Sequence, residues 1–397
     1  MTAFRTIDQL DARGKRVLVR ADLNVPMKDG AVSDTARIDQ AATTIRDLSA
    51  KGARVVVLSH FGRPDGKRVE TMSLAPIVPA LAKAVGKPVA FANDCIGPEA
   101  EAAVGALKNG DVLLLENTRF HAEEEKNEAR FVAGLAKLGD AFVNDAFSAA
   151  HRAHATTEGL AHRLPAFAGR GMQAELEALA RVLEKPQHPV VAIIGGAKVS
   201  SKLAVLENLL LQVDALVIGG GMANTFLKAQ GFAIGKSVHE PALLDKAREI
   251  MAKAAAQGCA IVLPTDGVVA KEFKAMAAAK TLPIGETPDD GMILDIGTDS
   301  IAAIAARLET AKTVVWNGPM GAFETPPFDN GTNAVARHVA MLTKVGAMVS
   351  VAGGGDTLAA LSQAGADDDF TYCSTAGGAF LEWLEGRELP GVKALAA

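Results

Sequence analysis

The sequence predicts an α/β protein built from two doubly wound parallel sheets. Short apolar runs rich in β-branched residues alternate with Ala- and Leu-rich stretches of helical spacing along all 397 residues. Uninterrupted apolar runs of this kind are typical of strands in parallel sheets that helices cover on both faces. Nine such runs are more than one sheet usually holds, and the length suits two or three domains. We therefore expect two sheets.

The predicted strands divide between the two halves of the chain. Aromatic residues make up only 5% and glycine is abundant at 38 residues, which favours α/β architecture over an all-β sandwich. The strands of the first half are expected at 16–20, 54–58, 111–115 and 141–144. Those of the second half are expected at 190–194, 215–218, 260–263, 313–316 and 348–351.

A helix is predicted between the two halves. Apolar residues recur at a helical spacing from Met172 to Leu183, and the helix should end before Pro186. We interpret it as a helix that connects two domains, with an ordinary surface helix as the alternative. A second helix is predicted over 379–385, near the end of the chain.

The composition excludes several classes of function. The net charge of −5 argues against a protein whose whole surface binds nucleic acid, so any anion site must be a local cluster of basic groups. The cysteines Cys95, Cys259 and Cys373 are isolated in sequence, as expected for free thiols in a reducing cytosol. Residues 1–20 mix charges without an apolar core, and no run reaches 18 apolar residues. We expect neither a secretory signal nor a membrane span, and therefore a cytoplasmic protein.

Three motif-like segments are rejected. Residues 231–237 (GFAIGKS) have three residues between the glycines where a P-loop needs four. Residues 169–174 (GRGMQA) fit a dinucleotide fingerprint, but no strand is expected before them, which argues against an oxidoreductase. His151 and His154 lack a further ligand at a suitable spacing, so a metal site built on them is not expected.

Basic and polar side chains follow the predicted strands of the first half. The carboxyl ends of parallel strands meet at one edge of a sheet, where ligands of such sheets bind. One arginine there is usually a solvated surface residue, but several predict a site for a small ligand with multiple negative charges. The arginines are Arg37, Arg63, Arg119 and Arg152, and the polar residues expected to bond hydroxyl groups are Asp22, Asn24 and His60.

Glycine turns follow the predicted strands of the second half. Glycine lets backbone N–H groups approach a ligand closely, and the N-terminus of the next helix favours anions. A single turn of this kind serves only to reverse the chain, but four at one sheet edge predict a phosphate cradle. The segments are 195–198, 219–221, 317–321 and 353–357.

Four side chains in this half are candidates for contacts with a charged ligand. Lys198 and Lys202 lie four residues apart at an expected helix start. Two cations on one face there repel each other, and both interact unfavourably with the positive end of the helix dipole. An anion between them explains the placement better than two surface lysines. Asp356 suits Mg²⁺ beside phosphates, and Glu324 suits a ribose hydroxyl, with an exposed loop acid as its alternative.

Together these segments resemble the signature set of the phosphoglycerate kinase family. They occur in that family's order and cover essentially the whole chain, which makes the set specific although no single member is. The segments are RADLNVP (20–26), SHFGRP (59–64), LENTRF (115–120), HRAH (151–154), GGAKVSSK (195–202), GGGMANTF (219–226), WNGPMGAFE (316–324) and VAGGGDT (351–357).

The resemblance implies a fold and a reaction. Residues 1–170 with the returning tail 379–397 would form a Rossmann-like domain for 3-phosphoglycerate or 1,3-bisphosphoglycerate. A connecting helix over 171–187 would lead to a second such domain, 188–378, for MgADP or MgATP. The implied activity is reversible phosphoryl transfer in glycolysis by a cytoplasmic monomer, through electrostatic stabilisation and domain closure.

The resemblance also assigns residues to roles. Asp22, Asn24, Arg37, His60, Arg63, Arg119 and Arg152 would bind the phosphoglycerate. The nucleotide would be held by Lys202, Gly220, Asn317, Glu324, Gly354, Gly355, Asp356 and Thr357, with Mg²⁺ on Asp356. The transferred phosphoryl group would be stabilised by Arg37, Lys198, Lys202, Gly377 and Gly378.

The sequence departs from the family pattern in two places. Residues 372–378 (YCSTAGG) stand where the family usually has HVSTGGG, although Gly377 and Gly378 are kept. Ile293 occupies a position near the base pocket that is Gly in some relatives. Another carboxylate kinase is disfavoured, because the arginines favour an acceptor that itself carries phosphate. A catalytically silent nucleotide-binding partner protein is the main alternative.

Overall fold

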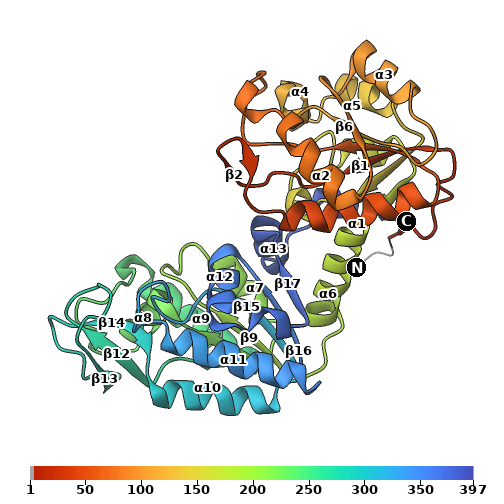
Figure 1. The fold of residues 1–397 in the computed structure, drawn as a ribbon. Helices are drawn as coiled ribbons and strands as arrows, with labels where there is room; N and C mark the ends of the chain where they lie inside the picture. Colours follow the sequence, from red (N-terminus) through yellow and green to blue (C-terminus); the bar gives the residue numbers. More distant parts are fainter. Residues whose placement is uncertain (1–3, 397) are drawn as a thin grey trace. The chain divides into compact units, whose positions relative to one another are not determined.

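The computed structural model describes residues 4–396 and divides into two compact units (Figure 1). The first unit contains the chain up to Glu177 and again from Glu388 onward, and the second contains Ala178–Arg387. Each unit is built around its own six-stranded parallel sheet. The predicted α/β class with two parallel sheets is therefore confirmed.

The sheet of the first unit contains the four predicted strands and two others at its edges. Every neighbouring pair is parallel, and Leu18 at the centre is in register with Val56 on one side and Phe142 on the other. Across the sheet the strands are β5 (Val89–Ala92), β6 (Val112–Leu115), β4 (Arg54–Leu58), β1 (Arg16–Arg20), β7 (Ala141–Asn144) and β8 (Ala166–Ala168).

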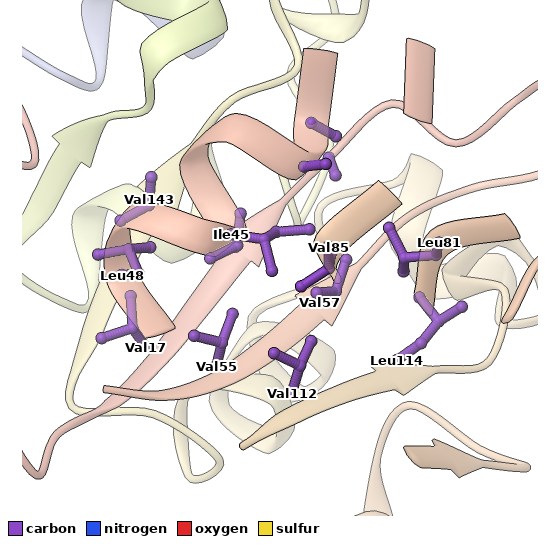
Figure 2. Close-up of a cluster of buried hydrophobic side chains, with 14 of the residues drawn as sticks. Val17, Ile45, Leu48, Val55, Val57, Leu81, Val85, Val112, Leu114 and Val143 are labelled. Carbon is purple, nitrogen blue, oxygen red and sulfur yellow. The ribbon is translucent and has the colours of Figure 1, made fainter. Parts of the chain in front are cut away.

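Helices cover this sheet because their apolar faces match its apolar strands. Figure 2 shows Ile45 and Leu48 of one helix and Leu81 and Val85 of another directed at valines and leucines of the strands. Burial of one such side chain contributes about 1.5–3 kcal/mol. The helices of this unit are α1 (Ala36–Ala50), α2 (Val78–Val85), α3 (Gly97–Gly105), α4 (Ala122–Glu125) and α5 (Ala129–Ala136), and β2 (Met27–Lys28) and β3 (Ala31–Val32) form a small hairpin.

The second unit has the same kind of sheet, with five predicted strands and one more. In order they are β11 (Ala260–Val262), β10 (Ala215–Ile218), β9 (Val190–Ile194), β15 (Thr313–Asn317), β16 (Val349–Gly353) and β17 (Tyr372–Ser374). The helices around it are α7 (Leu203–Leu209), α8 (Gly220–Ala229), α9 (Leu244–Gln257), α10 (Thr298–Thr310), α11 (Asn330–Lys344), α12 (Gly355–Ala364) and α13 (Gly377–Leu384).

A separate antiparallel sheet in the second unit was not predicted. Its strands are β13 (Ala279–Pro283), β12 (Asp266–Ala270) and β14 (Met292–Ile296), in that order. The register of β12 against β14 shifts between Val268 and Val269, so the strands do not keep a regular alternation. Among the described residues, no helix has both the length and the apolarity needed to cross a bilayer.

The helix predicted between the halves is present. It comprises α6 (Arg170–Leu179) and a π-helical turn, Ala180–Glu184, and it ends before Pro186 as expected. The division between the units falls after Glu177, within this helix.

The end of the chain returns to the first unit. In α14 (Pro390–Lys393) the Gly391 N–H donates to the Ala150 carbonyl oxygen at 2.8 Å, and Phe4 forms a bridge with Ala396. This returning segment begins at Glu388, not at residue 379. The reason is that α13 packs on α7, where the Asn208 amide donates to the Leu384 carbonyl oxygen at 2.8 Å.

Candidate active site

The loop after β1 and the start of α1 hold three of the predicted residues together. Arg37 Nη1 donates to the Asn24 carbonyl oxygen at 2.8 Å and lies 3.2 Å from Asp22 Oδ2. The Asn24 side-chain oxygen accepts from the Gly62 N–H at 3.0 Å, which links this loop to the one after β4. Arg37 keeps 36% of its side chain exposed, so its guanidinium still has donors free for an anion.

Arg119 is held at the end of the neighbouring strand. It lies in a 3₁₀ turn, Thr118–Phe120, that Asn117 caps by accepting from the Arg119 N–H at 3.1 Å. Its Nη1 donates to the Gly62 carbonyl oxygen at 2.9 Å, and its Nε lies 3.2 Å from Glu125. The side chain is only 8% exposed, so its orientation is fixed by these contacts.

A buried network that the sequence analysis missed orients His60. Arg20, 1% exposed at the end of β1, donates to His60 Nδ1 at 2.9 Å and to Thr156 Oγ1 at 2.9 Å. Thr156 in turn donates its hydroxyl to the buried carboxylate of Glu124. Because arginine only donates, Nδ1 of His60 must accept, and its proton is carried on Nε2.

The arginines create a common positive field. Burial lowers the pKa of His60 well below its usual range, and the charges of Arg20, Arg119 and Arg37 lower it further. Burial, followed by the charges of Arg119, Arg152 and Arg20, lowers the pKa of His154 to about 4. Both imidazoles are therefore neutral at pH 7, because the surrounding cations disfavour another positive charge.

Arg63 and Arg152 complete the predicted set. Arg63 is exposed, and the Arg152 Nε donates to His151 Nε2 at 3.3 Å. The charges of both lower the pKa of Arg119, in which burial is the largest cause. All seven residues predicted to bind phosphoglycerate thus belong to one cluster, although their individual roles stay predictions.

In the second unit, glycine backbones form the corresponding site around Lys202. The Lys202 ammonium donates to the Gly195 carbonyl oxygen at 2.7 Å and to the Asn317 carbonyl oxygen at 2.9 Å, which leaves one N–H free. Gly318 has φ +103°, and a Cβ there would lie 2.6 Å from Lys202 Nζ. Only glycine therefore fits at this point.

The two lysines do not share a helical face, which corrects the sequence prediction. Helix α7 begins at Leu203, so Lys202 is its N-cap residue and Lys198 lies in the preceding loop. That loop is held away from a helical path because Glu240 accepts from the Ser200 N–H at 2.9 Å. Burial lowers the pKa of Lys202 to about 8, against an opposing effect of Asp356.

The start of α12 faces the same region. The Thr357 hydroxyl accepts from the Gly318 N–H at 2.7 Å, and the Asn317 amide donates to the Gly353 carbonyl oxygen at 2.6 Å. Gly354, at φ +101°, and the exposed Gly355 and Asp356 lead into the helix. The first N–H groups of this ten-residue helix and the nearby Lys202 favour an anion.

A cavity of about 350 Å³ adjoins these loops. Its lining combines glycines with apolar side chains, including Phe273, Ile293 and Leu294. Glu324, Gly220 and Asp356 also line it. The combination of an apolar wall, a terminal carboxylate and a glycine cradle suits a base, a ribose and phosphates in turn.

Asp295 is a second residue that the sequence analysis missed. It lines the cavity, is 2% exposed, and accepts from the Gly331 N–H at 2.7 Å at the start of α11. Burial raises its pKa to about 7. Gly377 and Gly378 begin α13 as expected, with the nearby Ala376 backbone as its N-cap.

The family comparison agrees with this geometry. The model of the phosphoglycerate kinase family matches residues 7–387. The chain belongs to the phosphoglycerate kinase family. It is accordingly a kinase, a phosphotransferase of glycolysis.

Related phosphoglycerate kinases match along essentially their full length. The chain is 62% identical to the phosphoglycerate kinase of Methylobacterium radiotolerans and 63% identical to that of Azorhizobium caulinodans, with all of each chain covered. The solved phosphoglycerate kinase of Coxiella burnetii superposes with a TM-score of 0.93 at 44% identity, covering 99% of both chains. That of Pyrococcus horikoshii gives 0.82 at 33% identity, covering 99% of this chain and 98% of that one.

One argument against a dinucleotide-binding enzyme was wrong in detail. A strand, β8, does precede the GRGMQA segment, because Pro165 lies just outside an edge strand, where proline is tolerated. The helix start that would take a pyrophosphate is already occupied. Asp145 Oδ1 accepts from the N–H groups of Gly171 and Met172 at 2.8 and 3.2 Å. Membership of the kinase family and the capping of this helix start by Asp145 both argue against a dinucleotide at this segment.

Proposed function

We propose that the arginine cluster binds 3-phosphoglycerate or 1,3-bisphosphoglycerate and that the glycine cradle binds ADP or ATP. The observation that carries this proposal is the presence of one anion site in each unit, with different chemistry. The first consists of guanidinium groups suited to a phosphate and a carboxylate. The second joins a phosphate cradle to an apolar cavity, as a nucleotide requires.

The phosphoglycerate would be oriented from both ends. Arg63, Arg119 and Arg152 would grip its phosphate, because guanidinium groups form paired bonds to phosphate oxygens. Asp22, Asn24 and neutral His60 would bond its hydroxyl and carboxyl groups. The buried Arg20 holds the His60 ring by its Nδ1 atom, so the ring presents an N–H donor on Nε2.

The nucleotide would lie along the cavity in the second unit. Its base would contact Ile293 and the apolar wall, and Glu324 would accept from a ribose hydroxyl. Its phosphates would meet Gly220, Asn317 and the start of α12 from Gly354 to Thr357. Asp356 is exposed beside this start and supplies the single carboxylate that Mg²⁺ commonly takes from a protein. A bound Mg²⁺ would neutralise phosphate charge.

Transfer would depend on charge stabilisation without a general base. The acceptor is a carboxylate, which is already ionised at pH 7, so no proton has to be removed. Arg37 and Lys202 would stabilise the oxygens of the moving phosphoryl group, with help from Lys198 and the N–H groups of Gly377 and Gly378. Since the two ligands are assigned to different units, the units must close to bring them together. We also propose that the enzyme is a cytoplasmic monomer.

The test is turnover of 3-phosphoglycerate with MgATP, followed by coupling the acyl phosphate product to NADH oxidation. We expect robust turnover, and a loss in kcat of about 10³-fold or more in Arg37→Ala and in Lys202→Ala, because each removes a cation from the transition state. Arg46→Ala, on the same helix as Arg37, and Lys228→Ala, exposed on α8, serve as matched controls and should keep near-normal rates.

The same assay separates the kinase from a silent nucleotide-binding partner. A folded wild-type chain that binds both ligands but shows no turnover would support the silent protein. Near-normal turnover in either Arg37→Ala or Lys202→Ala would remove that residue from the proposed mechanism. The segment Tyr372–Ser374 and the following turn would then be the first place to look for altered chemistry.

A further inference from the structure

A cluster of three potential metal ligands lies in the first unit outside the residues assigned to catalysis. Asp94 and Cys95 follow β5, and His121 follows the 3₁₀ turn after β6. Because β5 and β6 are neighbouring parallel strands, with Ala92 in register with Leu115, both loops leave the sheet at the same edge. Within residues 4–396 this is the one place where three such side chains converge on a common point.

The three ligand atoms are already close to a binding geometry. His121 Nε2 lies 2.7 Å from Asp94 Oδ1, and the carboxylate, imidazole and thiol atoms all lie within 4.8 Å of one another. Zinc bonds of about 2.0–2.3 Å place tetrahedral ligands about 3.3–3.7 Å apart. Side-chain movements of about 1 Å would therefore be enough to close the set around an ion.

The surroundings hold the set in place and leave one side open. Cys95 is 1% exposed, and the His121 ring packs against Phe131 with 5.2 Å between ring centroids. The Asp94 carboxylate is held by the Cys95 N–H, which donates to Asp94 Oδ1 at 2.6 Å. The side chains of His121 and Asp94 keep 26% and 42% of their surface exposed. A site with three protein ligands and one solvent-facing position follows.

The local charge favours a cation. Cys95 is buried directly after Asp94, and burial together with this carboxylate disfavours a negative charge on its thiol when no cation is present. A divalent ion reverses this, because it balances the thiolate and one carboxylate, while the thiol proton is released to solvent. The resulting centre is electrically neutral, which suits a partly buried place.

We propose that Cys95, His121 and Asp94 form a zinc-binding site distinct from the magnesium–nucleotide site. The ligand set decides the class of metal. A thiolate and an imidazole suit Zn²⁺ and similar borderline-soft ions, whereas Mg²⁺ and Ca²⁺ require oxygen ligands. Since His121 directly follows the turn that carries Arg119, a bound ion would also tie that turn to the loop after β5.

The experiment uses the full chain and Co²⁺, which replaces Zn²⁺ and reports its ligands by absorption. We expect one equivalent of Co²⁺ to give a thiolate-to-metal charge-transfer band and strong tetrahedral visible bands, and one equivalent of Zn²⁺ to remove them. Cys95→Ser should abolish the charge-transfer band. His121→Asn should weaken Zn²⁺ binding by about tenfold or more, which gives a second reading if the serine variant does not fold.

Matched controls use the other two thiols. Cys259→Ser and Cys373→Ser, both in the second unit, should keep the cobalt spectrum unchanged. A wild-type chain without a charge-transfer band at stoichiometric Co²⁺ would overturn the proposal. A band that persists in folded Cys95→Ser, or that disappears in Cys259→Ser or Cys373→Ser, would overturn it as well, because the metal would then be bound elsewhere.

Discussion

The two candidate anion sites draw their positive potential from different parts of the chain. In the first unit it comes from the side chains of several arginines, placed at the ends of different strands. In the second it comes mainly from backbone N–H groups at glycine turns, with Lys202 as the half-buried cation. Arginine charges do not titrate near neutral pH and tolerate changes in the backbone, whereas the cradle contains positions such as Gly318 that have no room for a Cβ. The two sites should therefore fail under different perturbations.

The largest of these effects is expected from one methyl group in the cradle. In Gly318→Ala the new Cβ would lie 2.6 Å from Lys202 Nζ, at a backbone φ that L-residues rarely adopt. We expect the KM for MgATP to rise about 100-fold, because the strain and the displaced ammonium cost about 1–3 kcal/mol. Steady-state kinetics would measure this.

The control for that variant is Gly365→Ala, at the end of α12. Gly365 also has a positive φ, +65°, but no other described part of the chain comes within 4 Å of the place that its new methyl group would take. Its nucleotide kinetics should stay close to those of the wild type. Equal damage in the two variants would mean that backbone strain, and not the cradle, is responsible.

A smaller effect is expected from a charge-conserving change in the first site. Arg119→Lys keeps the positive charge but loses the planar fork and its bond to the Gly62 carbonyl oxygen. We expect the KM for 3-phosphoglycerate to rise about tenfold, the equivalent of about 1.4 kcal/mol, with little change in the KM for MgATP. Arg130→Lys, exposed on α5, is the control. An unchanged KM in Arg119→Lys would show that charge alone is needed there.

The pH dependence should also separate the two sites. Burial lowers the pKa of Lys202 to about 8, so the free enzyme loses this cation as the pH rises through 8. We expect kcat/KM for MgATP to fall by about tenfold per pH unit well above pH 8. At saturating MgATP, kcat/KM for 3-phosphoglycerate should not show this decrease, since bound phosphates keep the lysine protonated. Lys202→Arg should turn over more slowly, but its kcat/KM for MgATP should no longer fall above pH 8.

The smallest expected effect concerns stability alone. Burial raises the pKa of Asp145 to about 7 from 3.8, so the folded state holds this proton more tightly than the unfolded state. Stability is then lost as pH rises from about 4 to 7. Asp145→Asn should therefore gain about 2–3 kcal/mol relative to the wild type between pH 5 and pH 8.

Denaturant unfolding at the two pH values would measure this gain. Asp140→Asn is the control, because Arg16 lowers the pKa of Asp140 and that carboxylate is ionised in both states at pH 5 and at pH 8. Its effect on stability should be the same at both values. A gain for Asp145→Asn that does not change with pH would contradict the buried-carboxylate account.

The sequence predicted the parts of the fold that have a local signal. All nine predicted strands are present, because strands buried on both faces are apolar throughout. The edge strands β5, β8 and β17 were missed because three or four residues beside a proline or a polar turn carry no periodicity. The antiparallel sheet was missed because its partners lie far apart and its register shifts within β12.

The candidate site was predictable where motifs are continuous in sequence. Arginines after strands and glycine turns could be placed at sheet edges from the order of the elements alone. The residues that orient His60 could not be predicted, because in the sequence Arg20 is only the last residue of a strand and Glu124 is only one member of an acidic run. Of the apolar residues that line the cavity, Ile293 was placed near the base pocket by the resemblance, but Phe273 and Leu294 were not predicted, since they come from the separate antiparallel sheet and its loop.

The most direct test of the two-site account is a crossed binding measurement by calorimetry. 3-Phosphoglycerate and MgADP would each be titrated into the wild type, Arg119→Ala and Gly318→Ala. The account predicts that Arg119→Ala loses affinity for 3-phosphoglycerate but binds MgADP normally, and that Gly318→Ala does the reverse. Loss of both ligands in either folded variant, or loss of the wrong one, would contradict the assignment of one ligand to each unit.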